Sequence, residues 1–247
     1  MSELEHTPQR NDRQAHILPQ ADLDRSRCIV IGVGAVGYNV TLTLAAMGVG
    51  NLLLVDSDVV NVENQSSQGW KDRQIGQLKV NAAAAECSEV NSKYGTILPG
   101  QFTASHIEVV PERFAIRSPK ELAIGEDPEV LDYVFSCVDS IKTRSNIFES
   151  LKNRNVPFIV DGRMALSSCQ ILASTSEEDR KYYAKSFFAE EESYRAIGQC
   201  TVQSTLHVAK LCACLMVEAY SKSIQGKPQS RHFGIDLLSM DATYEMF

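Results

Sequence analysis

Residues 27–37 read RCIVIGVGAVG, and this stretch decides the fold. The apolar run before the first glycine predicts a strand buried on both faces, as in a parallel sheet with helices on either side. Gly32, Gly34 and Gly37 form the pattern GxGxxG, and residues 35–47 predict a helix. The first glycine permits a tight turn, the second lets backbone approach a phosphate, and the third lets helix and strand pack closely. A helix N-terminus favours anions, so the turn fits NAD, FAD, S-adenosylmethionine or ATP.

Apolar strands recur along the rest of the chain. Residues 52–55 (LLLV) predict a second buried strand that ends at Asp56, about twenty residues after the last glycine, where a carboxylate accepts hydrogen bonds from ribose hydroxyls. Further strands are expected at residues 106–110, 133–137, 158–160, 168–173 and 233–240. The fold class is therefore α/β: a Rossmann-like, doubly wound and mainly parallel sheet with an added antiparallel portion, in three layers.

Composition excludes several classes of protein. The chain has 247 residues and a net charge of −7, and sequence-independent nucleic-acid binding depends on positive charge. No apolar run reaches the ~18 residues of a membrane span. The seven cysteines are scattered and the first residues lack the apolar core of a signal peptide, which favours free thiols in a reducing compartment. We therefore expect a cytoplasmic protein that binds neither nucleic acid nor membrane.

Two parts are expected along the chain. Residues 1–26 are polar and predict an N-terminal arm, whereas residues 27–247 predict one domain, which is within reach of an α/β chain of this length. Within that domain, residues 175–199 are polar with acidic clusters and are expected to form a loop. Residues 201–225 predict a long helix that ends at a glycine.

Four further motifs accompany the glycine turn. Residues 10–14 read RNDRQ, residues 56–68 read DSDVVNVENQSSQ, residues 76–79 read GQLK and residues 139–144 read DSIKTR. This ordered set resembles the ThiF/MoeB/HesA family of adenylating enzymes, which activate the C-terminus of ubiquitin-like proteins. That family carries RxxRQ, GxGxxG, DxDxVxxxNxxRQ, GxxK and D-x4-R in the same order. The resemblance covers about residues 10–240.

The resemblance implies an ATP site with Mg²⁺. It implies that Asp56 binds the ribose, that Lys79 binds the phosphates and that Asp139 binds Mg²⁺ or the reacting phosphate. Taken alone, without the other motifs, Lys79 is better interpreted as a solvated helix lysine and Asp139 as a helix N-cap. Arg144 is expected to be a scaffold contact. The predicted nucleotide-binding residues are Gly32, Gly34, Ala35, Val36, Gly37, Asp56, Asp58, Asn64, Gln68, Lys79 and Asp139.

Arg13 and Ser67 carry two further implications. The resemblance implies a homodimer in which Arg13 reaches into the partner's ATP site, although by itself it is an arginine in a polar tail. Ser67 stands where the family has the arginine of NxxRQ, so one phosphate-binding cation is absent there. Loss of such a contact costs about 2.7–4 kcal/mol in a transition state. Arg73, Lys71 or Arg13 would compensate, or activity would be reduced; we favour Arg73 as the catalytic replacement.

Cys200 is the candidate nucleophile. It precedes the expected helix, whose N-terminus stabilises a thiolate. The resemblance implies attack of Cys200 on an acyl-adenylate to give a thioester or acyl persulfide, and the alternative is an inert helix cap. Cys169 is a weaker candidate. The chain has no CxxC pair, so no zinc site is expected.

The expected loop at residues 175–199 matches the place of a family loop under which the partner's tail threads. Tyr183, Phe187 and Phe188 are hypothesised to hold that tail, whereas the acidic clusters by themselves indicate a solvated face.

The leading hypothesis is an adenylyltransferase that acts on the C-terminal glycine of a small ubiquitin-like or sulfur-carrier protein. A second hypothesis keeps adenylation but takes a peptide or a tRNA-linked carboxylate as substrate. A third is a non-catalytic scaffold half of an activating complex, for which Ser67 is the argument. An NAD-linked dehydrogenase is the weakest, because no acid–base pair for hydride transfer is evident.

Overall fold

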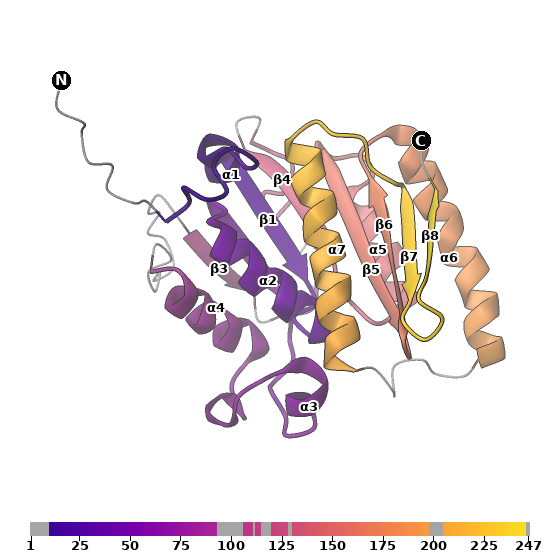
Figure 1. Ribbon diagram of the computed structural model, residues 1–247, viewed down its shortest axis with the longest axis horizontal. Coiled ribbons are helices and arrows are strands. Elements are labelled where there is room, and N and C mark those ends of the chain that lie inside the picture. The colour runs from indigo at the N-terminus through magenta and orange to yellow at the C-terminus, as the bar shows by residue number, and fades with distance from the viewer. Residues whose placement is uncertain are drawn as a thin grey trace.

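The computed structural model describes residues 10–92, 106–110, 112–114, 120–127, 130–197 and 205–245, with backbone alone for 106–109 and 188–197. Within these residues the chain forms an eight-stranded sheet in the order β3-β2-β1-β4-β5-β6-β7-β8 (Figure 1). The strands are β1 (Ser26–Ile31), β2 (Asn51–Val55), β3 (His106–Val110), β4 (Leu131–Ser136), β5 (Phe158–Ala165), β6 (Ser168–Ser174), β7 (His232–Asp236) and β8 (Asp241–Glu245).

Strand directions divide the sheet into two portions. Strands β3, β2, β1, β4 and β5 pair in parallel, and β5, β6, β7 and β8 pair antiparallel. The predicted mainly parallel sheet with an antiparallel addition is therefore confirmed. The chain runs outward from β1 to β2 and β3 and then returns to β4 on the other side of β1. In such sheets ligands bind at the carboxyl ends of the strands beside this reversal.

Helices cover both faces of the sheet. The helical elements are α1 (Gln20–Arg25), α2 (Ala35–Met47), α3 (Asn64–Gln68), η1 (Asp72–Gln74), α4 (Lys79–Val90), α5 (Ile141–Leu151), α6 (Glu177–Ile197) and α7 (Leu206–Ile224). On one face, α2, α4 and α7 pack against Cys28 and Val30 of β1; on the other, α5 and α6 pack on the side of Ile29 and Ile31. Successive strand residues thus enter different cores, which accounts for the continuous apolar strands and the three layers. None of the helices in the described residues is long and apolar enough to cross a membrane.

The N-terminal residues that the structure describes pack on this domain. Leu18 and Leu23 are buried in the same core as α2 and α7. The Gln14 side chain donates a hydrogen bond to the Met47 carbonyl at the end of α2, at 2.6 Å, and the Arg10 side chain donates to the Val90 carbonyl at the end of α4. Two residues of the RxxRQ motif therefore bind the carbonyl ends of helices.

The predicted loop at residues 175–199 is wrong over residues 177–197, which form α6. Asp179 Oδ2 accepts hydrogen bonds from the backbone N–H groups of Thr175 and Ser176, at 3.2 and 3.0 Å, and Ser176 Oγ accepts one from Asp179 N–H at 3.1 Å. These bonds satisfy donors at the start of the helix, where acidic residues are also favourable. The acidic cluster that suggested a loop is thus a helix-start signal.

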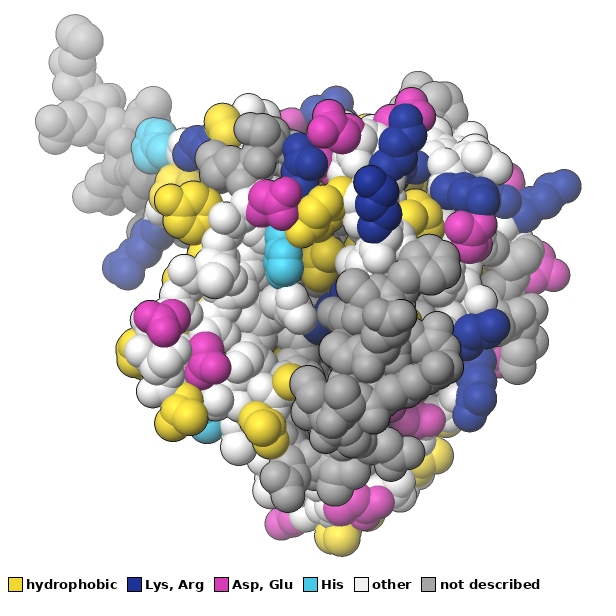
Figure 2. Space-filling model, turned by 90° about the vertical axis from the view of Figure 1, so that its right-hand side faces the viewer, with side chains coloured by type: hydrophobic (Ala, Val, Ile, Leu, Met, Phe, Trp, Pro, Cys, Tyr) yellow, Lys and Arg dark blue, Asp and Glu magenta, His cyan; other side chains and the backbone are white. Residues whose placement is uncertain are grey.

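Aromatic packing fixes α6 on the sheet and removes two of the proposed tail-binding residues. Tyr183 and Phe187, one helical turn apart, are buried and pack against Phe148 of α5 at ring-centroid distances of 5.3 and 6.0 Å. Both are core residues, so the hypothesis that they hold a partner's tail is wrong. The side chain of Phe188 lies outside the described residues. Figure 2 shows the face on this side of the molecule, where acidic and basic side chains are interspersed.

The glycine turn depends on close backbone approach. Gly32 has φ +88°, and a Cβ at this position would lie 2.8 Å from the Cys137 carbonyl oxygen. A Cβ at Gly37 would lie 1.8 Å from the carbonyl oxygen of Gly32. Nothing lies within 4 Å of a Cβ added to Gly34. The first and third glycines are therefore required for packing, and the second leaves space.

This difference predicts the stability of two alanine variants. Gly37→Ala forces the α2 backbone away from the turn and is expected to lower the free energy of unfolding by about 1–3 kcal/mol or more. Gly34→Ala, the control, is expected to cost about 0.5 kcal/mol, because alanine is a poorer N-cap than glycine. Urea unfolding of both variants measures the difference. Equal midpoints would contradict the packing role of Gly37.

Candidate active site

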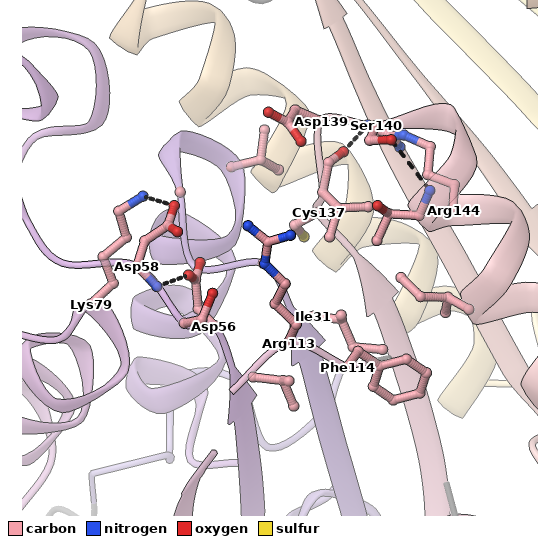
Figure 3. Close-up of a pocket in the computed structure, with 18 of the residues that line it drawn as sticks. Ile31, Asp56, Asp58, Lys79, Arg113, Phe114, Cys137, Asp139, Ser140 and Arg144 are labelled. Carbon is pink, nitrogen blue, oxygen red and sulfur yellow. Dashed lines mark hydrogen bonds and ion pairs between the residues drawn. The ribbon is translucent and has the colours of Figure 1, made fainter. Parts of the chain in front are cut away.

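A cavity of about 1000 Å³ lies at the carboxyl ends of β1, β2 and β4 (Figure 3). It is bounded by the glycine turn, the segment after β2, the start of α4, the segment after β3 and the β4–α5 connection. This is the position beside the strand-order reversal where open α/β sheets bind ligands. Among the predicted nucleotide-binding residues, it is lined by Gly32, Gly34, Ala35, Val36, Asp56, Asp58, Gln68, Lys79 and Asp139.

Backbone N–H groups hold the Asp56 carboxylate at the end of β2. One oxygen accepts a hydrogen bond from Val33 N–H at 2.6 Å, and the other accepts one from Asp58 N–H at 2.8 Å. The carboxylate therefore joins the glycine turn to the segment after β2. Further lone pairs remain on both oxygens, which suits a carboxylate that accepts from ribose hydroxyls.

Lys79 is a buried cation at the cavity wall. It opens α4, and its side chain is 8% exposed. Its Nζ lies 3.0 Å from Asp58 Oδ2, and its backbone N–H donates to the Asp58 carbonyl at 2.9 Å. The solvated-lysine alternative is therefore wrong. An ammonium has three donors, so Lys79 can bind an anion while it stays paired with Asp58.

Asp139 lies between β4 and α5 on the opposite side of the cavity from Lys79 (Figure 3). The N-cap of α5 is Ser140, whose Oγ accepts a hydrogen bond from Thr143 N–H at 3.3 Å, so the N-cap alternative for Asp139 is wrong. The Asp139 carboxylate is exposed and has no hydrogen-bond partner among the described residues. It is available to a ligand in the cavity.

Arg144 holds the segment that carries Asp139. Its buried guanidinium pairs with Asp161 and donates to the carbonyls of Val138 and Gly162, the latter at 3.0 Å. The second oxygen of Asp161 pairs with Arg163 at 2.6 Å. Removing one member of such a buried cluster leaves another charge buried without a partner. As the sequence predicted, Arg144 is a scaffold residue.

Arg73 and Lys71 are not brought to the cavity. Both pair with Glu86, a residue of α4 that is only 4% exposed, and Arg73 also pairs with Glu89 at 3.0 Å. Neither lines the cavity wall. The prediction that Arg73 replaces the missing family arginine is therefore contradicted: a buried carboxylate on α4 takes its charge.

Other predicted site residues have different surroundings. Asn64 opens α3, where its side-chain oxygen accepts from Asn61 N–H at 3.0 Å, outside the cavity wall. Gly37 lies behind the turn and contacts Gly32. Arg13 is exposed and does not line the cavity of its own chain. Cys200 lies outside the described residues.

Several residues of the cavity wall were not predicted from the sequence, and two of them carry chemistry: Arg113 and Cys137. Arg113 follows β3 and points into the middle of the cavity (Figure 3). The predicted strand at residues 106–110 was a usable signal, since parallel strands place the residues after them at one sheet edge. Cys137, expected only as a core residue, also lines the cavity. Burial raises the pKa of its thiol well above the ordinary value, so it stays protonated and is a poor nucleophile.

Known proteins share this sequence and this fold. The chain is 30% identical over 167 residues to molybdopterin-synthase adenylyltransferase of Escherichia coli, covering 66% of this chain and 59% of that protein. It is 30% identical over 148 residues to adenylyltransferase and sulfurtransferase MOCS3-1 of Zea mays, covering 60% of this chain and 28% of that protein. The chain thus spans less than two thirds of the length of these relatives.

Solved structures agree on the fold. The structure of PaaA aligns over 100% of this chain and 86% of its own, with a TM-score of 0.72 and 17% identity. Escherichia coli MccB with ATP aligns over 99% of this chain and 73% of its own, with a TM-score of 0.69 and 16% identity. The sequence matches the ThiF family over residues 8–247, which includes every motif around the cavity. The chain belongs to the ThiF family.

Proposed function

We propose that the chain is an adenylyltransferase, which joins a carboxylate to the α-phosphate of ATP and releases pyrophosphate. The observation that carries this proposal is one cavity that combines a carboxylate oriented by backbone, Asp56, with a buried ammonium, Lys79. The first suits a ribose and the second a phosphate. The names of two relatives, molybdopterin-synthase adenylyltransferase and MOCS3-1, support the same activity.

The cavity provides charge and orientation for this reaction. Both reactants are anionic, and no proton must move in the step that joins them, so catalysis requires neutralisation and alignment of the phosphates. The first residues of α2, Ala35 and Val36, lie at the cavity wall, where a helix start has N–H groups without helical partners. Lys79, held by Asp58, supplies a positive charge at the same cavity wall. These groups bind and orient the triphosphate.

Mg²⁺ fits beside Asp139. Mg²⁺ is commonly held by one or two carboxylates together with substrate phosphates, so it needs no cluster of protein ligands. Asp139 supplies one exposed carboxylate in the cavity, and Arg144 fixes the segment that carries it. When bound there, Mg²⁺ neutralises charge on the phosphates.

We further propose that the carboxylate belongs to the C-terminal glycine of a small ubiquitin-like or sulfur-carrier protein. The names of the relatives support this, among them a ubiquitin-like modifier-activating enzyme 5 from Drosophila grimshawi, 28% identical over 133 residues. A peptide is the second candidate substrate. It is favoured by the structure of Escherichia coli MccB with AMPCPP and MccA, which aligns over 96% of this chain and 71% of its own with a TM-score of 0.70. The scaffold alternative is disfavoured, because Asp56, Lys79 and Asp139 meet in one cavity.

The remaining proposals concern assembly and later chemistry. We propose a single domain that forms a homodimer, in which Arg13 acts on the partner's site; its exposure and its absence from its own cavity support this. A thioester on Cys200 stays a proposal from the sequence. A reducing, cytoplasmic location is supported by the free cysteines of the described residues.

Lys79→Ala is expected to abolish adenylate formation. The protein is mixed with ATP, Mg²⁺ and candidate small proteins ending in glycine or short peptides, and mass spectrometry detects the added AMP. Loss of the ammonium should slow the reaction about a hundredfold or more. Arg73→Ala is the control and should keep most of the wild-type rate, because Arg73 pairs with Glu86. Full activity of Lys79→Ala would refute the assignment of the phosphate site.

Mixing two inactive variants tests the action of Arg13 across the dimer. Arg13→Ala keeps Lys79 but lacks the arginine that would reach into the partner's site, and Lys79→Ala keeps that arginine. An exchanged equimolar mixture is expected to recover about a quarter of the wild-type rate, because half of the dimers are mixed and each has one complete site. A mixture that stays inactive while dimers exchange would mean that Arg13 does not act in trans.

Cys200→Ala separates the two chemical steps. If Cys200 is the nucleophile, the variant still forms the adenylate but no thioester, which mass spectrometry of the enzyme without reductant would show. Cys214→Ala, which changes an exposed cysteine of α7, is the matched control. Unchanged thioester formation in Cys200→Ala would assign Cys200 a structural role.

A further inference from the structure

Arg113 is a cation of the cavity that no sequence motif identifies. We propose that Arg113 binds the phosphates of the nucleotide from the β3 side of the cavity, and so supplies a positive charge that the family pattern places at position 67. The inference rests on the proposed ATP site and adds to it a binding residue specific to this chain.

The fold fixes where Arg113 projects. Strand β3 pairs in parallel with β2, so that Val110 lies opposite Val55, and Asp56 N–H donates to the Val110 carbonyl at 3.2 Å. The chain after β3 therefore runs beside Asp56. Phe114 is 7% exposed in the core beneath α5 and α6, and it anchors the segment there. Arg113, its neighbour, is exposed and points into the cavity between Asp56 and Cys137 (Figure 3).

The other cavity cations already have carboxylate partners. Lys79 pairs with Asp58, and Arg144 pairs with Asp161. The Arg113 guanidinium forms no ion pair or hydrogen bond with any described residue, although it lines the same wall. Among the described cations of the cavity wall, Arg113 is therefore the one without a carboxylate partner, and all of its donors are open to an anion. A guanidinium offers five donors in a planar fork that matches a phosphate.

Carboxylates outnumber unpaired cations on the described cavity wall, so a triphosphate needs added positive charge there. The described wall has the carboxylates of Asp56, Asp58, Glu112 and Asp139. Their combined field repels a triphosphate, and an unpaired guanidinium in their midst offsets part of that repulsion. Ser67 of α3 contributes no charge, and its hydroxyl donates to the Glu63 carbonyl at 3.3 Å. The two nearest alternatives in sequence, Lys71 and Arg73, are engaged with Glu86.

Direct binding of ATP and of adenosine tests the inference without any carboxylate substrate. Arg113→Gln removes the charge but keeps a polar side chain, whereas Arg113→Lys keeps the charge. We expect Arg113→Gln to weaken ATP binding about tenfold to a hundredfold, with adenosine binding changed less than about twofold, because the lost bond is to a charged group. Arg113→Lys should lie between the wild type and Arg113→Gln. Isothermal titration measures ATP binding, and ligand-observed NMR measures the weaker adenosine binding.

Salt dependence provides a second readout that a structural role would not move. The ATP affinity of the wild type should fall more steeply with ionic strength than that of Arg113→Gln, because one cation–phosphate contact is screened. Arg73→Ala is the control: it removes an arginine outside the cavity and should bind ATP like the wild type. Thermal unfolding confirms that each variant folds; Arg113 is exposed, so its variants should unfold near the wild-type temperature.

Two outcomes would overturn the inference while the ATP site itself stands. Unchanged ATP affinity in Arg113→Gln would remove Arg113 from the binding site. Equal loss of ATP and adenosine would place the side chain against the base or sugar and away from the phosphates. Failure of the wild type to bind ATP would overturn the proposed function as well, and is recognised without any variant.

Discussion

A single buried carboxylate, Asp161, organises the centre of the molecule. It pairs with Arg144 of α5 and with Arg163 of β5, and Arg163 also donates to Ser186 of α6 at 2.9 Å. Asp161 thereby connects strand β5 with helices α5 and α6 and, through Arg144, with the loop before α5. Buried charges persist only where they are paired and hydrogen-bonded. The cavity wall that carries Asp139 therefore depends on an ion pair whose carboxylate, Asp161, is fully buried behind it.

The parallel portion of the sheet determines which segments of the chain form the cavity. Each parallel strand ends at the same edge, so residues far apart in sequence arrive together: the glycine turn after β1, Asp56 after β2, Arg113 after β3 and Asp139 after β4. Asp56 is the point where these segments join, since it accepts from the turn and from its own downstream backbone. The antiparallel strands β6 to β8 extend the sheet away from this edge. The site is a property of the parallel half.

Short stretches of sequence predicted the features that depend on interactions between residues close together in the chain. The glycine turn, the apolar strands and the place of Asp56 after β2 follow from steric limits and periodicity over short stretches, whereas Lys79 and Asp139 were assigned through the resemblance to the family motifs. Helix α6 did not follow from such patterns, because its acidic start resembles a loop until Ser176 and Asp179 are seen to cap it and Phe148 to cover its aromatic stripe. Arg73 was misplaced because its partner, Glu86, lies on another helix. Arg113 was missed because the pairing of β3 with β2 joins residues about fifty apart in sequence.

Lys79 and Arg113 differ in how firmly they are held. Lys79 is fixed by its ion pair with Asp58, whereas the Arg113 side chain has no partner among the described residues. Backbone amides, Asp58 and the Arg144 contacts hold most polar groups in place before a ligand arrives, so their ordering is complete in the folded protein. Arg113 has no such support, and ordering an arginine side chain costs up to about 2 kcal/mol of rotamer entropy. When a ligand binds at this wall, most of the side-chain entropy that is lost is therefore that of Arg113. Such a side chain can follow the phosphates through more than one position while the rigid groups hold the sugar.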